Sequence, residues 1–282
     1  MTICLIIALI ILILNPNIAS SSVISSSLLW FNKLIGILLP TMLITDLIIN
    51  SKLLYFISDK LFFPFHKIFN IRYKKSVLLI IISILCGAPS ATRLIVDSYD
   101  NNEIDFKECQ ALIIFMSFLS LPYISYILNI LNINILYFLL PSLFISIIFM
   151  KIYNRGTIGK TNYIYHKTNV INTFFQSINK SINVLLVILI IMICFNITIS
   201  LFNINEYTYF LFEPLKGHEL ITNIKNIRLR NSLMLLSLNI LGLSPIIQIK
   251  YVSSKTNLVH LILYKLISSI PFLFYLIIVL IS

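Results

Sequence analysis

Arg93 is the ionisable side chain best placed to bind a ligand, because it stands just after a break in an apolar stretch. The apolar run 76–86 ends at Gly87-Ala88-Pro89-Ser90, and Arg93 follows one helical turn later. Proline cannot continue a helix but suits the first turn of a new one, so the break predicts a half-helix that begins near Pro89. The free N–H groups of such a helix end and the planar guanidinium of Arg93 both suit a carboxylate. The pattern therefore predicts the binding of a small anion.

A second break repeats the pattern in the C-terminal part of the chain. The apolar run 232–241 ends at Gly242-Leu243-Ser244-Pro245, where Ser244 is a potential N-cap. Gln248 follows this break at the spacing at which Arg93 follows the first one, and it would offer a neutral hydrogen-bonding group opposite Arg93. The candidate substrate-binding residues are Gly87, Pro89, Ser90, Arg93, Gly242, Ser244, Pro245 and Gln248.

Each of the two apolar runs is too short to cross a membrane alone. About ten apolar residues cover roughly 15 Å as a helix, which is half of a hydrocarbon core of roughly 30 Å. Helices broken at membrane depth are tolerated where protein or a water-filled cavity surrounds them, and in transporters they build the substrate site. A pair of such breaks indicates transport.

Other interpretations of the ionisable residues stay open. Arg93 has Asp97 one turn away for an i,i+4 ion pair, or its long side chain could extend to the membrane surface. Asp46 lies near the end of an apolar span and is a candidate coupling site for a proton or cation. A residue at a helix end that faces lipid headgroups is an equally good interpretation of Asp46.

Composition identifies a polytopic membrane protein. Hydrophobic residues make up 59% of the 282 residues and charged residues 11%, and the mean hydropathy is +0.97. The net charge of +11 comes mostly from short connections between apolar runs, so it is expected to set topology rather than to bind nucleic acid. The four cysteines form no close pair, and no catalytic, metal-binding or cofactor-binding pattern is present in the sequence. The sequence therefore predicts no enzyme activity.

The predicted fold is all-α, with about six continuous spans plus two re-entrant or broken helices in an inverted repeat. The segment 51–70, which alternates phenylalanine with lysine, is predicted to lie in the membrane interface. One domain covers 1–282, with a first repeat at 28–150 and a second at 183–282. Continuous spans are predicted at 28–49, 111–131, 133–150, 183–202 and 259–281, with 3–14 as a retained N-terminal span.

Two strongly basic connections, 52–75 and 151–180, are placed in the cytoplasm by the positive-inside rule. Both lie there if 76–102 enters and leaves the membrane on the same side as a re-entrant hairpin. The second repeat is then inverted relative to the first, and Lys250 and Lys255 are left outside.

The segment Gly87-Ala88-Pro89-Ser90-Ala91-Thr92-Arg93-Leu94-Ile95-Val96-Asp97-Ser98-Tyr99 resembles the sporulation integral membrane protein YlbJ family, which belongs to the nucleoside-recognition or gate-domain membrane proteins. The resemblance extends over 38–46, 213–217 and 241–248, although Ala91-Thr92 and Arg93 depart from the glycine or alanine and the lysine expected there. It implies import of dipicolinate, a small aromatic dicarboxylate, across the outer forespore membrane.

Three functions follow from the sequence. The leading one is a carrier for a small organic anion in the lipid bilayer, with a homo-oligomer left open. The alternatives are a structural membrane protein of a sporulation assembly and a nucleoside or nucleobase carrier. Paired broken helices favour a carrier over a scaffold, and Arg93 favours an anion over an uncharged nucleoside.

Overall fold

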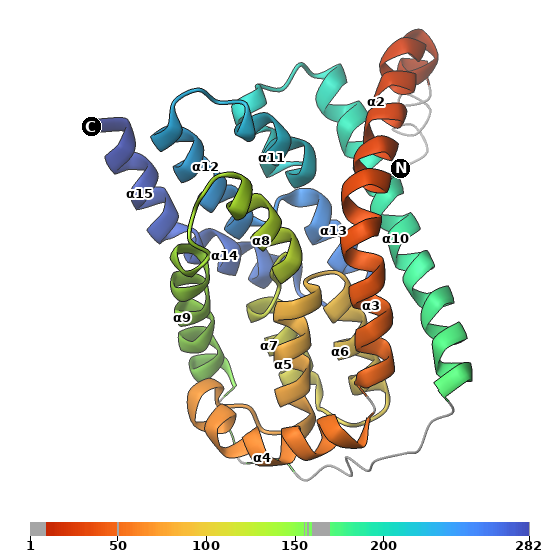
Figure 1. Cartoon of the computed structure of the whole chain (residues 1–282), viewed down its shortest axis with the longest axis vertical. Helices are drawn as coiled ribbons and strands as arrows, with labels where there is room; N and C mark the ends of the chain where they lie inside the picture. Colours follow the sequence, from red (N-terminus) through yellow and green to blue (C-terminus); the bar gives the residue numbers. More distant parts are fainter. Residues whose placement is uncertain (1–9, 50, 155, 157, 160–169, 282) are drawn as a thin grey trace.

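The computed structural model of the protein describes residues 10–49, 51–154, 156, 158–159 and 170–281, and in these ranges every regular element is a helix. Figure 1 shows a bundle with α4 lying across one end, called the α4 end below. In chain order the elements are α2 (Pro16–Leu29), the π-helical turn η1 (Trp30–Ile35), α3 (Gly36–Ile48), α4 (Lys52–Phe69), α5 (Lys74–Cys86), α6 (Ser90–Asp100), α7 (Phe106–Phe115), α8 (Leu121–Ile130), α9 (Leu136–Tyr153), α10 (Val170–Leu201), the 3₁₀ helix η2 (Glu206–Leu211), α11 (Pro214–Thr222), α12 (Ile227–Ile240), α13 (Leu243–Val252), α14 (Leu258–Ser268) and α15 (Ile270–Ile281).

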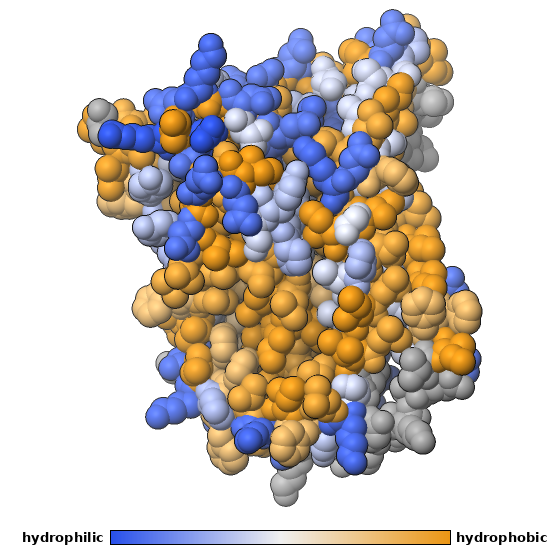
Figure 2. Space-filling model, in the orientation of Figure 1, coloured by the Kyte–Doolittle hydropathy of each residue, from blue (hydrophilic) through white to orange (hydrophobic). Residues whose placement is uncertain are grey.

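Four helical stretches in the described ranges are long and apolar enough to cross a membrane, and a fifth is the pair α14 and α15, which bends by 41°. The four are Pro16–Ile48, Leu136–Tyr153, Ile171–Leu201 and Ile227–Val252. Apolar residues gather over the middle of the face seen in Figure 2, with hydrophilic ones toward both ends. The composition and these helices together identify a membrane protein.

Several predicted spans match these helices, but one does not. Residues 133–150 and 183–202 fall almost entirely within α9 and α10, and 28–49 falls within the helix that continues from α2 through η1 and α3. The predicted continuous span 111–131 is wrong, because α7 ends at Phe115 and α8 begins at Leu121. Pro122 at the start of α8 explains the interruption, since proline suits a first turn. Most of the predicted span 3–14 lies outside the described residues.

The first predicted break is the tip of a helical hairpin. Gly87 has φ 67°, which lets α5 end, and α6 then packs back along α5 (Figure 1). A Cβ at Gly87 would lie 2.3 Å from the backbone nitrogen of Ser120, so only glycine fits. The Ala88 N–H also donates to the Phe118 carbonyl at 2.7 Å. The hairpin tip therefore rests on the linker between α7 and α8.

The second predicted break has a different geometry. Gly242 has φ 75°, but α12 and α13 continue as one stretch without a sharp bend. The hairpin beside it is formed by η2 and α11, and its turn accepts a hydrogen bond at 2.8 Å from the Ser244 N–H to the Phe212 carbonyl. The prediction that the two breaks are equivalent is therefore wrong. The break at Gly87 resembles the turn before Pro214, because each is the tip of a hairpin. The break at Gly242 resembles the α7–α8 linker, because each is hydrogen-bonded to the tip of a hairpin.

A hydrogen-bonded ion pair corrects the predicted placement of Lys255. Its Nζ lies 3.2 Å from the Asp100 carboxylate, and the Gln110 side chain donates to the Lys255 carbonyl at 2.8 Å. The loop after α13 therefore lies beside the loop between α6 and α7, at the α4 end. Lys250 and Lys255 therefore lie toward the same end of the bundle as the basic α4, because α12 and α13 form one long stretch and do not turn back.

Two apolar clusters hold the bundle together. One lies around α5 and α7, and the other joins α8, α10 and α12 to the first long helix. That long helix packs against α10, where the Trp30 indole N–H donates to the Leu185 carbonyl at 2.9 Å. In the hairpin of α5 and α6, α5 packs against α3 and α7, and α6 packs against α7.

Candidate functional site

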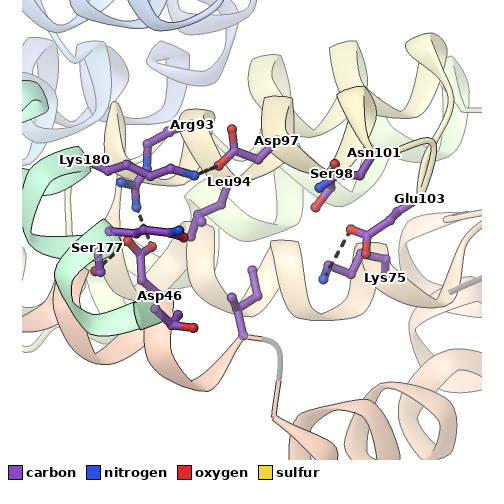
Figure 3. Close-up of a pocket in the computed structure, with 13 residues that line it drawn as sticks. Asp46, Lys75, Arg93, Leu94, Asp97, Ser98, Asn101, Glu103, Ser177 and Lys180 are labelled. Atoms are coloured by element: carbon purple, nitrogen blue, oxygen red, sulfur yellow. Dashed lines mark hydrogen bonds and ion pairs between the residues drawn. The ribbon is translucent and has the colours of Figure 1, made fainter. Parts of the chain in front are cut away.

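Arg93 points from α6 toward the end of α3, where it forms an ion pair with Asp46 (Figure 3). Arg93 is 9% exposed and Asp46 is 7% exposed, so the pair is largely buried. The Asp46 carboxylate also accepts a hydrogen bond at 2.8 Å from the Ser177 hydroxyl of α10. The interpretations of Arg93 as a partner of Asp97 and as a surface residue are both wrong. Asp46, predicted as a candidate coupling site, is the counter-ion of Arg93, and its role in coupling stays a prediction.

The guanidinium of Arg93 keeps unused donors. Its Nη2 binds Asp46, whereas its Nε and Nη1 are buried without a hydrogen-bond partner among the described residues. A buried donor without a partner costs about 1–3 kcal/mol, and more when it is charged. A carboxylate binds guanidinium through two parallel N–H groups, either Nε with Nη2 or Nη1 with Nη2, so a ligand bound in this way would compete with Asp46 at Nη2.

Arg93 is one of the residues that line a cavity of about 190 Å³ between α3, α5, α6 and α10. A water molecule needs about 10–15 Å³ of such space, so the cavity admits a small organic molecule. Its polar walls are three ion pairs, Arg93–Asp46, Lys180–Asp97 at 3.1 Å and Lys75–Glu103 at 3.3 Å (Figure 3). Cations and anions balance, so an added anion must compete with a carboxylate that is already there. We call this space the Arg93 cavity.

A second, smaller cavity of about 40 Å³ lies where the helix breaks meet. Pro89, Pro245 and Gln248 line it together with Pro214 and Ser120, so the structure does bring the two predicted breaks together. Arg93 does not line it, and Gln248 donates to the Ser244 hydroxyl at 3.1 Å within its own helix. The prediction that Gln248 stands opposite Arg93 is therefore wrong. We call this space the central cavity.

Of the remaining predicted residues, the two glycines serve the backbone. Gly87 and Gly242 provide the positive φ angles of the two breaks. A Cβ at Gly242 would lie 2.7 Å from the Phe210 carbonyl oxygen. The Ser90 hydroxyl, next to the hairpin tip, is buried and lacks a hydrogen-bond partner among the described residues.

Three residues of the central region were not predicted. Glu213 is fully buried in the wall of the central cavity, where its carboxylate caps α11 by accepting from the Leu215 and Lys216 N–H groups at 3.2 and 2.7 Å. Tyr123 and His218, both buried, share a hydrogen bond of 2.8 Å between the phenol oxygen and Nδ1. The sequence does carry a signal for Glu213, because an acid directly before Pro214 is a typical start of a helix.

The protein is thus a helical membrane protein with a buried cationic group beside a cavity. Comparison with family models, with curated proteins and with solved structures finds no match for this chain. The resemblance to the YlbJ family stays a prediction.

Proposed function

We propose that the protein is a multi-pass membrane carrier for a small organic anion, bound in the Arg93 cavity. The observation that carries this proposal is that Arg93, a residue that lines the cavity, has a buried guanidinium whose Nε and Nη1 lack a hydrogen-bond partner among the described residues. Ionisable residues inside membrane proteins are rare and mark substrate or ion pathways. The ion pair with Asp46 uses one of the three guanidinium nitrogens and leaves the other two without a hydrogen-bond partner among the described residues.

In the proposed carrier, Asp46 stabilises the state without substrate. Without substrate, the Asp46 carboxylate neutralises Arg93, and the Ser177 hydroxyl fixes it in place. A substrate carboxylate that binds Arg93 through two parallel N–H groups would use Nη2 with Nε or Nη1, and it would therefore displace Asp46. The bond between α6 and α3 would then weaken, so substrate binding would change the relative stability of the conformations of the carrier.

The arrangement of helices supports alternating access. In the proposed membrane orientation, each half of the chain supplies a first span, a hairpin, a broken span and a last span. These are α3, α5–α6, α7–α8 and α9 in the first half, and α10, η2–α11, α12–α13 and α14–α15 in the second. The first hairpin enters from the α4 end and the second from the opposite end (Figure 1). Such inverted halves rock against each other in many secondary transporters.

The basic residues of α4 and its neighbours place the α4 end in the cytoplasm under the positive-inside rule. By its resemblance to the YlbJ family, the proposed substrate is dipicolinate and the proposed location is the outer forespore membrane. The two carboxylates of such a substrate match a cavity that holds several cations, each with a competing acid.

Protection from chemical labelling tests anion binding directly. Gln176 lines the Arg93 cavity and is exposed, so Gln176→Cys in a cysteine-free background provides a reporter. Dipicolinate should slow its reaction with a maleimide, whereas the uncharged dimethyl ester should not. Lys225→Cys, in the connection between α11 and α12, is the control and should react equally with and without dipicolinate. Equal labelling of Gln176→Cys under all conditions would argue against an anion site here.

A further inference from the structure

Another buried cation, which does not line the Arg93 cavity, lies at one of the helix breaks. Lys265 of α14 is 3% exposed, and its ammonium group donates a hydrogen bond to the Ser117 backbone carbonyl. The rings of Phe118 and Tyr264 lie 5.1 and 5.5 Å from the same nitrogen. Within the described part of the chain, Lys265 forms no ion pair with a carboxylate. A charge held this way inside a membrane protein is a candidate functional group.

The carbonyl that Lys265 binds belongs to the α7–α8 linker, on which the first hairpin rests. Ser117 O accepts from Lys265, and the next carbonyl, Phe118 O, accepts from the Ala88 N–H of the hairpin tip. The end of α7 carries the partial negative charge of a helix C-terminus. In transporters with broken helices, unwound carbonyls and such helix ends coordinate the coupling cation. In this protein, the Lys265 ammonium group binds the same kind of ligand, the Ser117 carbonyl.

The other broken span uses neutral groups. Just before the α12–α13 break, the Asn239 side chain donates to the Ser268 and Ser269 hydroxyls at 2.9 and 3.2 Å and accepts from Ser142 at 3.2 Å. The positive charge is therefore specific to the break that contacts the hairpin of Arg93. A structural requirement common to both breaks does not explain it.

We propose that the Lys265 ammonium is a built-in cation, which occupies the α7–α8 break in place of a free coupling cation. The break is then organised for transport without sodium or another alkali-metal ion. The transport half of this inference rests on the proposed function, but the cation half does not. The two halves are therefore tested separately.

The cation half is tested by thermal unfolding of the full-length purified protein in sodium, lithium, potassium or choline chloride at equal concentration. The midpoint of the parent protein should be the same in all four salts. Lys265→Ser removes the ammonium and leaves room beside the Ser117 carbonyl, so its midpoint should fall in choline and recover by roughly 3 °C or more in a small alkali cation. A parent protein stabilised by sodium, or a Lys265→Ser variant that no cation stabilises, would overturn the proposal.

The transport half is tested with dipicolinate uptake into proteoliposomes. The parent should transport equally in sodium and in choline, and Lys265→Met, of similar length and without charge, should transport at least tenfold more slowly. Lys250→Met is the matched control at the α13 end, where the lysine binds the Ser254 and Thr256 carbonyls near the surface, and it should transport normally.

Normal uptake by Lys265→Met would refute the role of Lys265 and leave the carrier intact. No uptake by the parent would refute the carrier, while the unfolding result still decides on the built-in cation. Should Lys265→Met not accumulate, Lys265→Arg must accumulate and remain insensitive to cations, or the proposal fails.

Discussion

The ion pair between Arg93 and Asp46 gives a prediction that separates binding from stability. Arg93→Gln leaves the Asp46 carboxylate buried, with the Ser177 hydroxyl as its remaining hydrogen-bond partner among the described residues. Removing one partner of a buried ion pair destabilises by about 3–5 kcal/mol, because the remaining charge is uncompensated. Arg93→Gln should therefore unfold more easily. The double variant Arg93→Gln/Asp46→Asn removes both charges and should recover most of that loss, with a coupling energy of at least about 2 kcal/mol.

Uptake should respond differently from stability. Both variants lack the guanidinium fork, and each 1.4 kcal/mol of lost binding is tenfold in affinity, so both should take up dipicolinate at least tenfold more slowly. Arg93→Lys should keep part of the uptake, because the charge survives without the bidentate geometry.

The assay is a double-mutant cycle that combines thermal or denaturant unfolding with uptake by proteoliposomes. The matched control is the Lys180–Asp97 pair, whose side chains are 54% and 40% exposed. Exposed pairs contribute about 0–1 kcal/mol, so Lys180→Gln/Asp97→Asn should show little coupling. A double variant at Arg93 and Asp46 that is stable and transports normally would refute the anion site.

Two further predictions concern the fold. Gly87→Ala should sharply reduce the amount of folded protein, measured by size-exclusion chromatography, because its Cβ would meet the Ser120 backbone at 2.3 Å; Gly36→Ala, which meets no atom within 4 Å, is the control and should fold normally. Cysteines at Lys60 and Lys255 should both react with an impermeant reagent from the cytoplasmic side, and a cysteine at Lys225 from the opposite side; labelling of Lys60→Cys and Lys255→Cys from opposite faces would contradict the crossing of α12 and α13.

Much of the helix content could be predicted from the sequence, because apolar runs and glycine-proline breaks are local signals. The interruptions at Gly87 and Gly242 were predicted from these signals. A glycine-proline break in the sequence does not determine whether the chain turns back as a hairpin or continues in the same direction. That depends on contacts far along the chain, such as Lys255 with Asp100, and the equivalence of the two breaks was wrong for this reason.

The candidate site shows the same limit. Arg93 and Asp46 were each chosen from their own segments, because an ionisable residue in an apolar stretch is conspicuous. Their pairing across 47 positions has no local signal, and neither has the third member, Ser177. Lys265 was overlooked because a lysine near the start of a predicted span looks like an interfacial residue. Only its contact with the Ser117 carbonyl distinguishes it.

Transport of an anion is tested by the time course of radiolabelled dipicolinate entering proteoliposomes. We expect saturable uptake that exceeds that of protein-free liposomes, is inhibited by other small dicarboxylates but not by nucleosides, and is lost in Arg93→Gln/Asp46→Asn. Uptake by folded parent protein that never exceeds the protein-free rate, with the gradient applied in either direction, would contradict it and favour a structural role.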